Sequence, residues 1–232
     1  MAGRFLRASQ GAIAARGCFV AALSGGHTPV DLYREIARIG GALDWEKTHL
    51  FLVDERLVPY EDSRSNFGMI KKTLLDAVPL RRSNVHPVSV DPPDPHVSAK
   101  MYEDDIRAFF QAAPGVMPRF DLVLLGLGED GHTASLFPGT PIPGDAIHAV
   151  GAVAESEGRT SRVTLTLPVI NNAREVIFLV TGKGKAPIVR RVVEERDAHL
   201  PASLVTPAEG RLSFLCDREA ASALQGVKTE GK

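Results

Sequence analysis

A histidine and a carboxylate lie two residues apart in the glycine-rich stretch GLGEDGHTASLFPG, which spans residues 126–139. Histidine exchanges protons near neutral pH, and a nearby carboxylate can fix the tautomer and orientation of an imidazole. The spacing therefore makes His132 a candidate general base, with Asp130 as its orienting partner. The alternative is a histidine that follows a strand and takes no part in chemistry.

The first six residues of this stretch also fit G-x-G-x-x-G, the pattern of a dinucleotide-binding turn. In that interpretation Glu129 and Asp130 would lie beside two phosphate charges, and like charges repel. The pattern also requires an acidic ribose partner about 20 residues further on, within one strand–helix–strand unit. Asp145 is only a loose candidate for that partner. We therefore expect no nucleotide cofactor at this loop.

Short apolar runs alternate with amphipathic helical patterns along the chain, which is typical of a parallel sheet covered by helices. We predict one domain over residues 1–232, with a Rossmann-like, mostly parallel α/β sheet flanked by helices on both faces. The predicted strands are CFVAAL (18–23), HLFLVD (49–54), FDLVLLG (120–126), RVTLTL (162–167), EVIFLVTG (175–182) and RLSFLC (211–216). The predicted helices cover residues 28–39, 64–78, 96–112 and 185–196.

In such a sheet, ligands bind beyond the carboxyl ends of the strands. The first strand is followed by SGGHTP (24–29), where Gly25 and Gly26 allow a tight turn and close approach of a ligand. We expect Thr28 to cap the next helix, with Pro29 at its first position. Free backbone amides at a helix start can bind an anion, although an ordinary strand–helix turn has the same composition.

Polar side chains also follow two other predicted strands. Asp54 and Arg56, in the segment DER, are two residues apart on an extended chain and should point to the same side, toward a polar ligand or into a structural salt bridge. After a later strand, TGKGKA (181–186) carries Lys183 and Lys185, either of which could reach a phosphate or remain at the surface. In SRSNFG (63–68) we expect a helix cap from Ser65 or Asn66.

Net charge, the cysteines and the first residues bear on the partners and the location of the protein. The formal net charge is −1, which gives no indication of nucleic-acid or membrane binding. Cys18 and Cys216 each lie in an apolar run, so we expect buried free thiols and a cytoplasmic protein. The first 30 residues have arginines but no acid, mildly like a transit peptide. We expect no cleavage there, because CFVAAL forms part of the core.

Five segments in order resemble the 6-phosphogluconolactonase family. They are LSGGHTPVDLY, VDERLVP followed by SRSNFGM, FDLVLLGLGEDGHTASLFPG, RVTLTLPVINNAREVIFLVTGKGKA and LPASLV, and they run from about residue 20 to residue 217. The resemblance implies hydrolysis of a phosphorylated sugar lactone in the pentose phosphate pathway, without a metal or an organic cofactor. It also implies the fold of the glucosamine-6-phosphate deaminases.

On the matching positions, the resemblance implies His132 as catalytic base, with Asp54, Arg56 and Lys185 as polar residues of the active site. The phosphate turn then comprises Gly25, Gly26, His27 and Thr28, and Arg162 is added to the phosphate candidates. This sequence departs from the family at His27, where serine is usual, so a hydroxyl contact to the phosphate is lost. It also has a shorter segment before its first strand, from which we expect apolar surface left exposed unless another subunit covers it.

Two other functions remain as alternatives. A glucosamine-6-phosphate deaminase would share the fold, but such enzymes read closer to GHIAFNEP where this chain has GHTASLFP. A non-catalytic sugar-phosphate sensor would share the phosphate turn, but such proteins usually carry a separate DNA-binding segment. We expect an enzyme that acts as a monomer or a small homo-oligomer.

Overall fold

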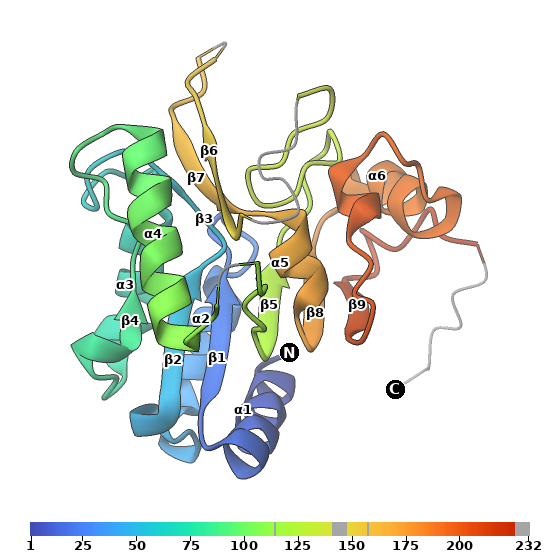
Figure 1. Ribbon diagram of the computed structural model, residues 1–232. Coiled ribbons are helices and arrows are strands. Elements are labelled where there is room, and N and C mark those ends of the chain that lie inside the picture. Colours follow the sequence, from blue (N-terminus) through green and yellow to red (C-terminus); the bar gives the residue numbers. More distant parts are fainter. Residues whose placement is uncertain (114, 141–147, 157, 226–232) are drawn as a thin grey trace.

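A parallel sheet forms the centre of the computed structural model, which describes residues 1–113, 115–140, 148–156 and 158–225 (Figure 1). Its six strands lie in the order β4-β2-β1-β5-β8-β9, and every neighbouring pair is parallel. In that order they are Val85–His86, Thr48–Leu52, Phe19–Leu23, Leu122–Leu125, Glu175–Val180 and Arg211–Cys216. The predicted α/β fold with a mostly parallel sheet is thus confirmed.

One predicted strand belongs to a different sheet. RVTLTL forms β7 (Arg162–Leu165), which pairs antiparallel with both β3 (Asp54–Arg56) and β6 (Val150–Val153). Val53 joins the two sheets, because its amide donates to the Leu23 carbonyl at 2.9 Å and its carbonyl accepts from the Leu165 amide at 2.8 Å. The chain therefore leaves the parallel sheet at Val53 and carries Asp54–Arg56 onto the small sheet.

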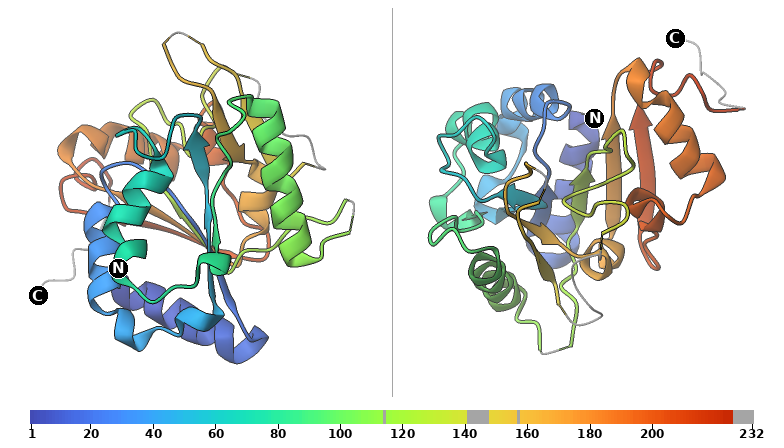
Figure 2. Two further views of the ribbon diagram at one scale, coloured as in Figure 1. Left: turned by 90° about the vertical axis from the view of Figure 1, so that its left-hand side faces the viewer. Right: turned by 90° about the horizontal axis from the view of Figure 1, so that it is seen from above.

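Helices cover both faces of the parallel sheet (Figures 1 and 2). On one face lie α1 (Ala2–Arg16), α2 (Val30–Arg38) and α3 (Asn66–Thr73), and on the other lie α4 (Pro95–Phe110) and α5 (Leu167–Asn172). The helix α6 (Ala186–Arg190) lies on the β9 side of the molecule and continues as a π-helical turn, Arg191–Glu195. Short 3-10 turns are Gly40–Ala42, Trp45–Lys47, Leu75–Ala77, Arg82–Asn84, Lys183–Lys185 and Pro201–Leu204.

The helix α1 was not predicted from the sequence. Phe5 is buried and packs edge-on against Phe19 of β1, with ring centroids 5.2 Å apart. Arg4 binds Glu175 of β8, and Arg16 binds Asp121 just before β5. The segment before the first strand is therefore an integral layer of the fold and covers part of the sheet. Cys18 and Cys216 are free, as expected, but each is only partly buried.

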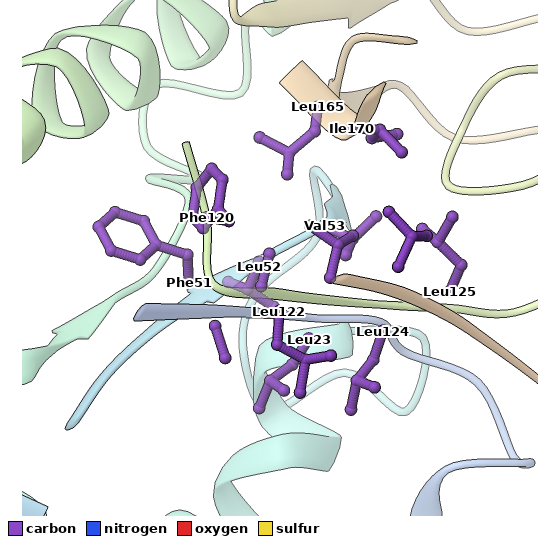
Figure 3. Close-up of a cluster of buried hydrophobic side chains, with 14 of the residues drawn as sticks. Leu23, Phe51, Leu52, Val53, Phe120, Leu122, Leu124, Leu125, Leu165 and Ile170 are labelled. Atoms are coloured by element: carbon purple, nitrogen blue, oxygen red, sulfur yellow. The ribbon is translucent and has the colours of Figure 1, made fainter. Parts of the chain in front are cut away.

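The core follows the alternation of side chains along the strands. Leu23 and Leu124 point toward the helices of one face, while Val53, Leu125 and Ile170 lie on the other (Figure 3). Tyr102 of α4 is fully buried, and its hydroxyl both donates to the Leu52 carbonyl and accepts from the Leu52 amide, each at 2.7 Å. These hydrogen bonds hold the carboxyl end of β2, just before the predicted polar segment DER.

Glu55 is a fully buried carboxylate that holds the first turn of α3. It accepts hydrogen bonds from the amides of Asn66 and Phe67 at 2.8 and 2.7 Å, and from the Ser65 hydroxyl at 3.1 Å. Burial raises its pKa above the ordinary value, and the bonds from the backbone amides partly oppose that rise. Ser65 caps α3 through the Gly68 amide, as predicted, which leaves the Asn66 side chain available for another contact.

Gly68 allows this turn to pack against the chain beside it. A Cβ at Gly68 would lie 2.0 Å from the Tyr60 carbonyl oxygen. We expect Gly68→Ala to lower the free energy of unfolding by about 2 kcal/mol or more, because backbone would have to move. Urea denaturation at constant pH measures this.

Gly11→Ala is the matched control, since Gly11 lies within α1 and, apart from its neighbours in the helix, no heavy atom of the described residues would lie within 4 Å of its Cβ. There the better helix propensity of alanine should raise stability by up to about 1 kcal/mol. Equal stabilities for the two variants would contradict the close-packing interpretation.

Candidate active site

The sheet order places two loops side by side at its centre. From β1 the chain winds outward to β2 and β4, and from β5 it winds in the opposite direction to β8 and β9. Connections that diverge in this way leave a crevice beyond the carboxyl ends of the two central strands. The turn after β1 and the glycine-rich loop after β5 flank that crevice.

A cavity of about 320 Å³ occupies this position and contains most of the predicted site. All of the predicted site residues except Asp130 line it, and Asp130 binds one of the lining residues. The lining residues are Ser24, Gly25, Gly26, His27, Thr28, Pro29, Asp54, Arg56, Asn66, Gly126, Leu127, Gly128, His132, Ala134, Arg162 and Lys185. They come from β3 and β7 of the small sheet, from the segments that follow β1, β5 and β8, and from the start of α3.

The turn after β1 requires its two glycines for different reasons. A Cβ at Gly25 would lie 1.8 Å from Asn66 Oδ1, so the turn and α3 can meet only through a glycine. Gly26 has φ of 89°, in the left-handed region that favours glycine. The predicted cap is wrong: α2 begins at Val30 with Pro29 as its N-cap residue, and no side chain caps it. Thr28 instead lines the cavity, and His27 is exposed at its edge.

The glycine-rich loop forms a tight turn around His132. The Gly128 amide donates to the His132 carbonyl at 2.8 Å, and the Gly131 amide donates to the Gly128 carbonyl at 3.1 Å. A Cβ at Gly128 would lie 2.1 Å from His132 Nδ1 and 2.5 Å from Asp130 Oδ1. The glycine is therefore needed for the contact between these two side chains. After β5, no helix begins within residues 126–140, unlike a dinucleotide-binding turn, and Asp145 lies outside the described residues.

Asp130 and His132 form the pair that their spacing predicted. Asp130 Oδ1 lies 2.5 Å from His132 Nδ1 and also accepts from the His132 amide at 3.1 Å. An ionised carboxylate can only accept, so the neutral imidazole carries its proton on Nδ1 and leaves the Nε2 lone pair free. Partial burial raises the pKa of Asp130, but the two hydrogen bonds from His132 outweigh it, and the pKa lies below its usual range. Asp130 thus stays ionised at neutral pH.

Asp54 of β3 is hydrogen-bonded to α3 and to the glycine-rich loop after β5. It is 6% exposed, and its Oδ1 accepts from Asn66 Nδ2 at 3.2 Å while its Oδ2 accepts from the Ser135 hydroxyl at 2.7 Å. Asn66 Nδ2 also donates to the Asp54 carbonyl at 2.8 Å. Sequence reasoning assigned Asn66 a helix-capping role and did not single out Ser135. The sequence feature that could have pointed to Ser135 is its position three residues after His132, within the same glycine-rich motif.

Two arginines lie side by side on neighbouring strands of the small sheet. Arg56 and Arg162 are direct partners in the antiparallel pairing of β3 with β7. Burial lowers the pKa of Arg162, and the neighbouring charge of Arg56 lowers it further. The Arg56 Nη1 donates to the Arg64 carbonyl at 2.5 Å, but the Nε atoms of both arginines are buried without a hydrogen-bond partner among the described residues. The two cations therefore create a strongly anion-attracting wall.

Lys185 also lines the cavity. It lies at the end of the 3-10 turn Lys183–Lys185, which follows Gly182 with φ of 96°. Lys185 lines the cavity, whereas Lys183 is exposed and outside it. The sequence did not decide which of the two lysines could reach a phosphate, and only Lys185 is among the residues that line the cavity. Within the described ranges, no cluster of histidine, cysteine or acidic side chains has the form of a metal site.

The model of the family described as glucosamine-6-phosphate isomerases/6-phosphogluconolactonase matches residues 1–214. A 6-phosphogluconolactonase of Synechocystis sp. is 43% identical over 92% of this chain and 88% of the relative, and that of Rattus norvegicus is 40% identical over 93% and 84%. The structure of a 6-phosphogluconolactonase from Trypanosoma cruzi superposes with a TM-score of 0.84 at 30% identity, covering 96% of this chain and 91% of the other.

The resemblance found in five short segments thus extends over nearly the whole chain, through sequence and fold alike. The helices of the described residues include none that is long and apolar enough to cross a bilayer. On the family match and the extent of these similarities, the chain belongs to the glucosamine-6-phosphate isomerase/6-phosphogluconolactonase family.

Proposed function

We propose that this protein hydrolyses 6-phospho-D-glucono-1,5-lactone to 6-phospho-D-gluconate. Its relatives are named 6-phosphogluconolactonases for this activity. The observation that carries the proposal is the hydrogen-bonded pair of Asp130 and His132, in a cavity that also contains a glycine turn and Lys185. A general base and anion-binding groups in one cavity match a substrate that carries both a reactive ester and a phosphate.

In the proposed reaction, His132 Nε2 takes a proton from a water molecule as the water oxygen attacks the lactone carbonyl carbon. The carbonyl π electrons move onto oxygen, and the Arg56 guanidinium stabilises the resulting oxyanion. The tetrahedral intermediate then collapses, the bond to the ring oxygen breaks, and the imidazolium returns the proton to that oxygen. Asp130 holds the imidazole in its orientation and stabilises its charged form. Water and side chains suffice for these steps.

The backbone of Gly25–Thr28 and the side chains of Lys185 and Arg162 bind the substrate phosphate. Amides of a glycine turn and two cations suit a dianion, and binding remote from the carbonyl fixes which atom meets His132. His27, exposed at the edge of the turn, donates to the phosphate in place of the hydroxyl usual in the family. We also propose a single catalytic unit over residues 1–232, acting in the cytoplasm as a monomer or small homo-oligomer with no nucleic-acid or membrane partner.

The proposal is tested by proton release from freshly prepared 6-phosphogluconolactone, after subtraction of its spontaneous hydrolysis. Acceleration by the protein is expected. Ammonia release from glucosamine 6-phosphate would instead indicate a deaminase. Tight binding of 6-phosphogluconate with unchanged decay of the lactone would indicate a non-catalytic binder.

His132→Ala should lower kcat by about 100-fold or more, the scale expected for loss of a general base. The side chain is only partly buried, so the variant should unfold at nearly the parent temperature. The control is His199→Ala, since His199 is exposed and outside the cavity lining. The role of His132 is refuted if both variants keep parental turnover.

Lys185→Ala should raise KM for the lactone by roughly 10-fold or more, because a charge-assisted contact to the phosphate is lost. Lys183→Ala is a close control, since it removes the same charge from the same turn but outside the cavity. Steady-state kinetics of both variants measure the difference. A similar KM for the two variants would remove Lys185 from the phosphate site.

Arg56→Ala should mainly lower kcat, by roughly 100-fold, if its guanidinium stabilises the oxyanion. A group that binds only the phosphate would raise KM instead and leave kcat close to the parent value. The kcat and KM of this variant therefore separate the two roles that the sequence left open. A change confined to KM would reassign Arg56 to the phosphate.

A further inference from the structure

The Ser135 hydroxyl lies between the buried carboxylate of Asp54 and the partly buried guanidinium of Arg162. It donates to Asp54 Oδ2 at 2.7 Å, and Arg162 Nη1 lies 3.5 Å from its oxygen. The direct distance from Arg162 Nη1 to Asp54 Oδ2 is 4.0 Å, longer than a charge-assisted hydrogen bond. The two opposite charges are thus close but not in contact.

Ser135 is itself held firmly. It is 1% exposed, and its amide donates to the Thr164 hydroxyl at 3.2 Å. The single hydroxyl hydrogen is used by Asp54, so only the oxygen lone pairs remain for Arg162. The serine oxygen therefore accepts from the cation while its hydrogen satisfies the anion.

Several forces favour closure of Arg162 onto Asp54. The two opposite charges attract strongly at this depth, and Arg56, the strand partner of Arg162, repels it. The contact that opposes closure is weak, since the Arg162 guanidinium carbon lies 5.4 Å from the centroid of the Phe137 ring and makes only a cation–π contact there. A closed ion pair would neutralise Arg162 and reduce its attraction for a substrate phosphate.

We propose that Ser135 is a positioning residue that keeps Arg162 from closing onto Asp54 and so leaves the guanidinium available to the substrate. The proposal rests on the phosphate-binding role assigned to Arg162 above. The proposal gives Ser135, a serine of the glycine-loop motif, a role in substrate affinity. Ser135 does not itself line the cavity, but its partners Asp54 and Arg162 do. The proposal also explains how Asp54 can lie beside the cation without cancelling it.

The first test is Ser135→Ala. We expect KM for the lactone and Kd for 6-phosphogluconate, measured by calorimetry, each to rise roughly 10-fold, with kcat changed less than about twofold. In a crystal structure of the variant, the distance from Arg162 Nη1 to Asp54 Oδ2 should fall from 4.0 Å to about 3 Å. Ser9→Ala is the control, because Ser9 is equally buried, lies on α1, and its hydroxyl has no partner in the described residues.

The second test is a double-mutant cycle in the Asp54→Asn background. The amide removes the negative charge that attracts Arg162, so adding Ser135→Ala there should leave the Kd for 6-phosphogluconate unchanged within about twofold. An equal loss of affinity in both backgrounds, or unchanged affinity in Ser135→Ala itself, would overturn the proposal. If Ser135→Ala does not fold, Ser135→Cys replaces it in both backgrounds, because a thiol is similar in size but a weaker hydrogen-bond donor. The Kd for 6-phosphogluconate is expected to change in the same direction as in Ser135→Ala.

Failure of the proposed function has a different signature. A parent protein that neither accelerates lactone hydrolysis nor binds 6-phosphogluconate would refute the lactonase role. The crystallographic distance in Ser135→Ala would still test the spacing role of the serine, because it requires no ligand. An unchanged 4.0 Å separation in that structure would refute it.

Discussion

The pairing of β1 with β5 is the constraint on which the cavity depends. These strands are in register at Ala21 with Leu122 and at Ala22 with Val123. After β1 the chain runs toward one edge of the sheet, and after β5 it runs toward the other. The loops that follow β1 and β5 therefore diverge and leave a crevice between them for a ligand. The glycine turn and the histidine loop flank this crevice for that reason, although they lie far apart in the sequence.

The small antiparallel sheet supplies the other wall of the cavity and is joined to the parallel sheet through a single residue, Val53. Val53 donates into the parallel sheet at Leu23 and accepts from the small sheet at Leu165. This double use rigidly fixes the start of β3, and the alternation of an extended strand then sends Asp54 and Arg56 into the cavity while Glu55 points to the first turn of α3. In the triplet DER, Asp54 and Arg56 thus serve the cavity, while Glu55 between them stabilises the start of α3.

The features that the sequence predicted well are local ones. Nearly continuous apolar runs identified five of the six strands of the parallel sheet but missed the short edge strand β4, and two-residue spacing identified the pair of Asp130 and His132. Pairing partners are not local, so RVTLTL was assigned to the wrong sheet. The segment of α1 has few large apolar residues among its alanines and arginines, and its amphipathic pattern is correspondingly weak. Ser135 was missed because its significance depends on Asp54, which a distant segment supplies.

Local charge, rather than the net charge of −1, decides which ligands this cavity attracts. Arg56, Arg162 and Lys185 line it, whereas Asp54 is the carboxylate among its lining residues. That carboxylate is already bound by Asn66 and Ser135, so it contributes less neutralisation than a free acid would. Low-dielectric walls strengthen the remaining positive potential, and a nearly neutral protein can therefore favour a phosphate dianion at one place on its surface.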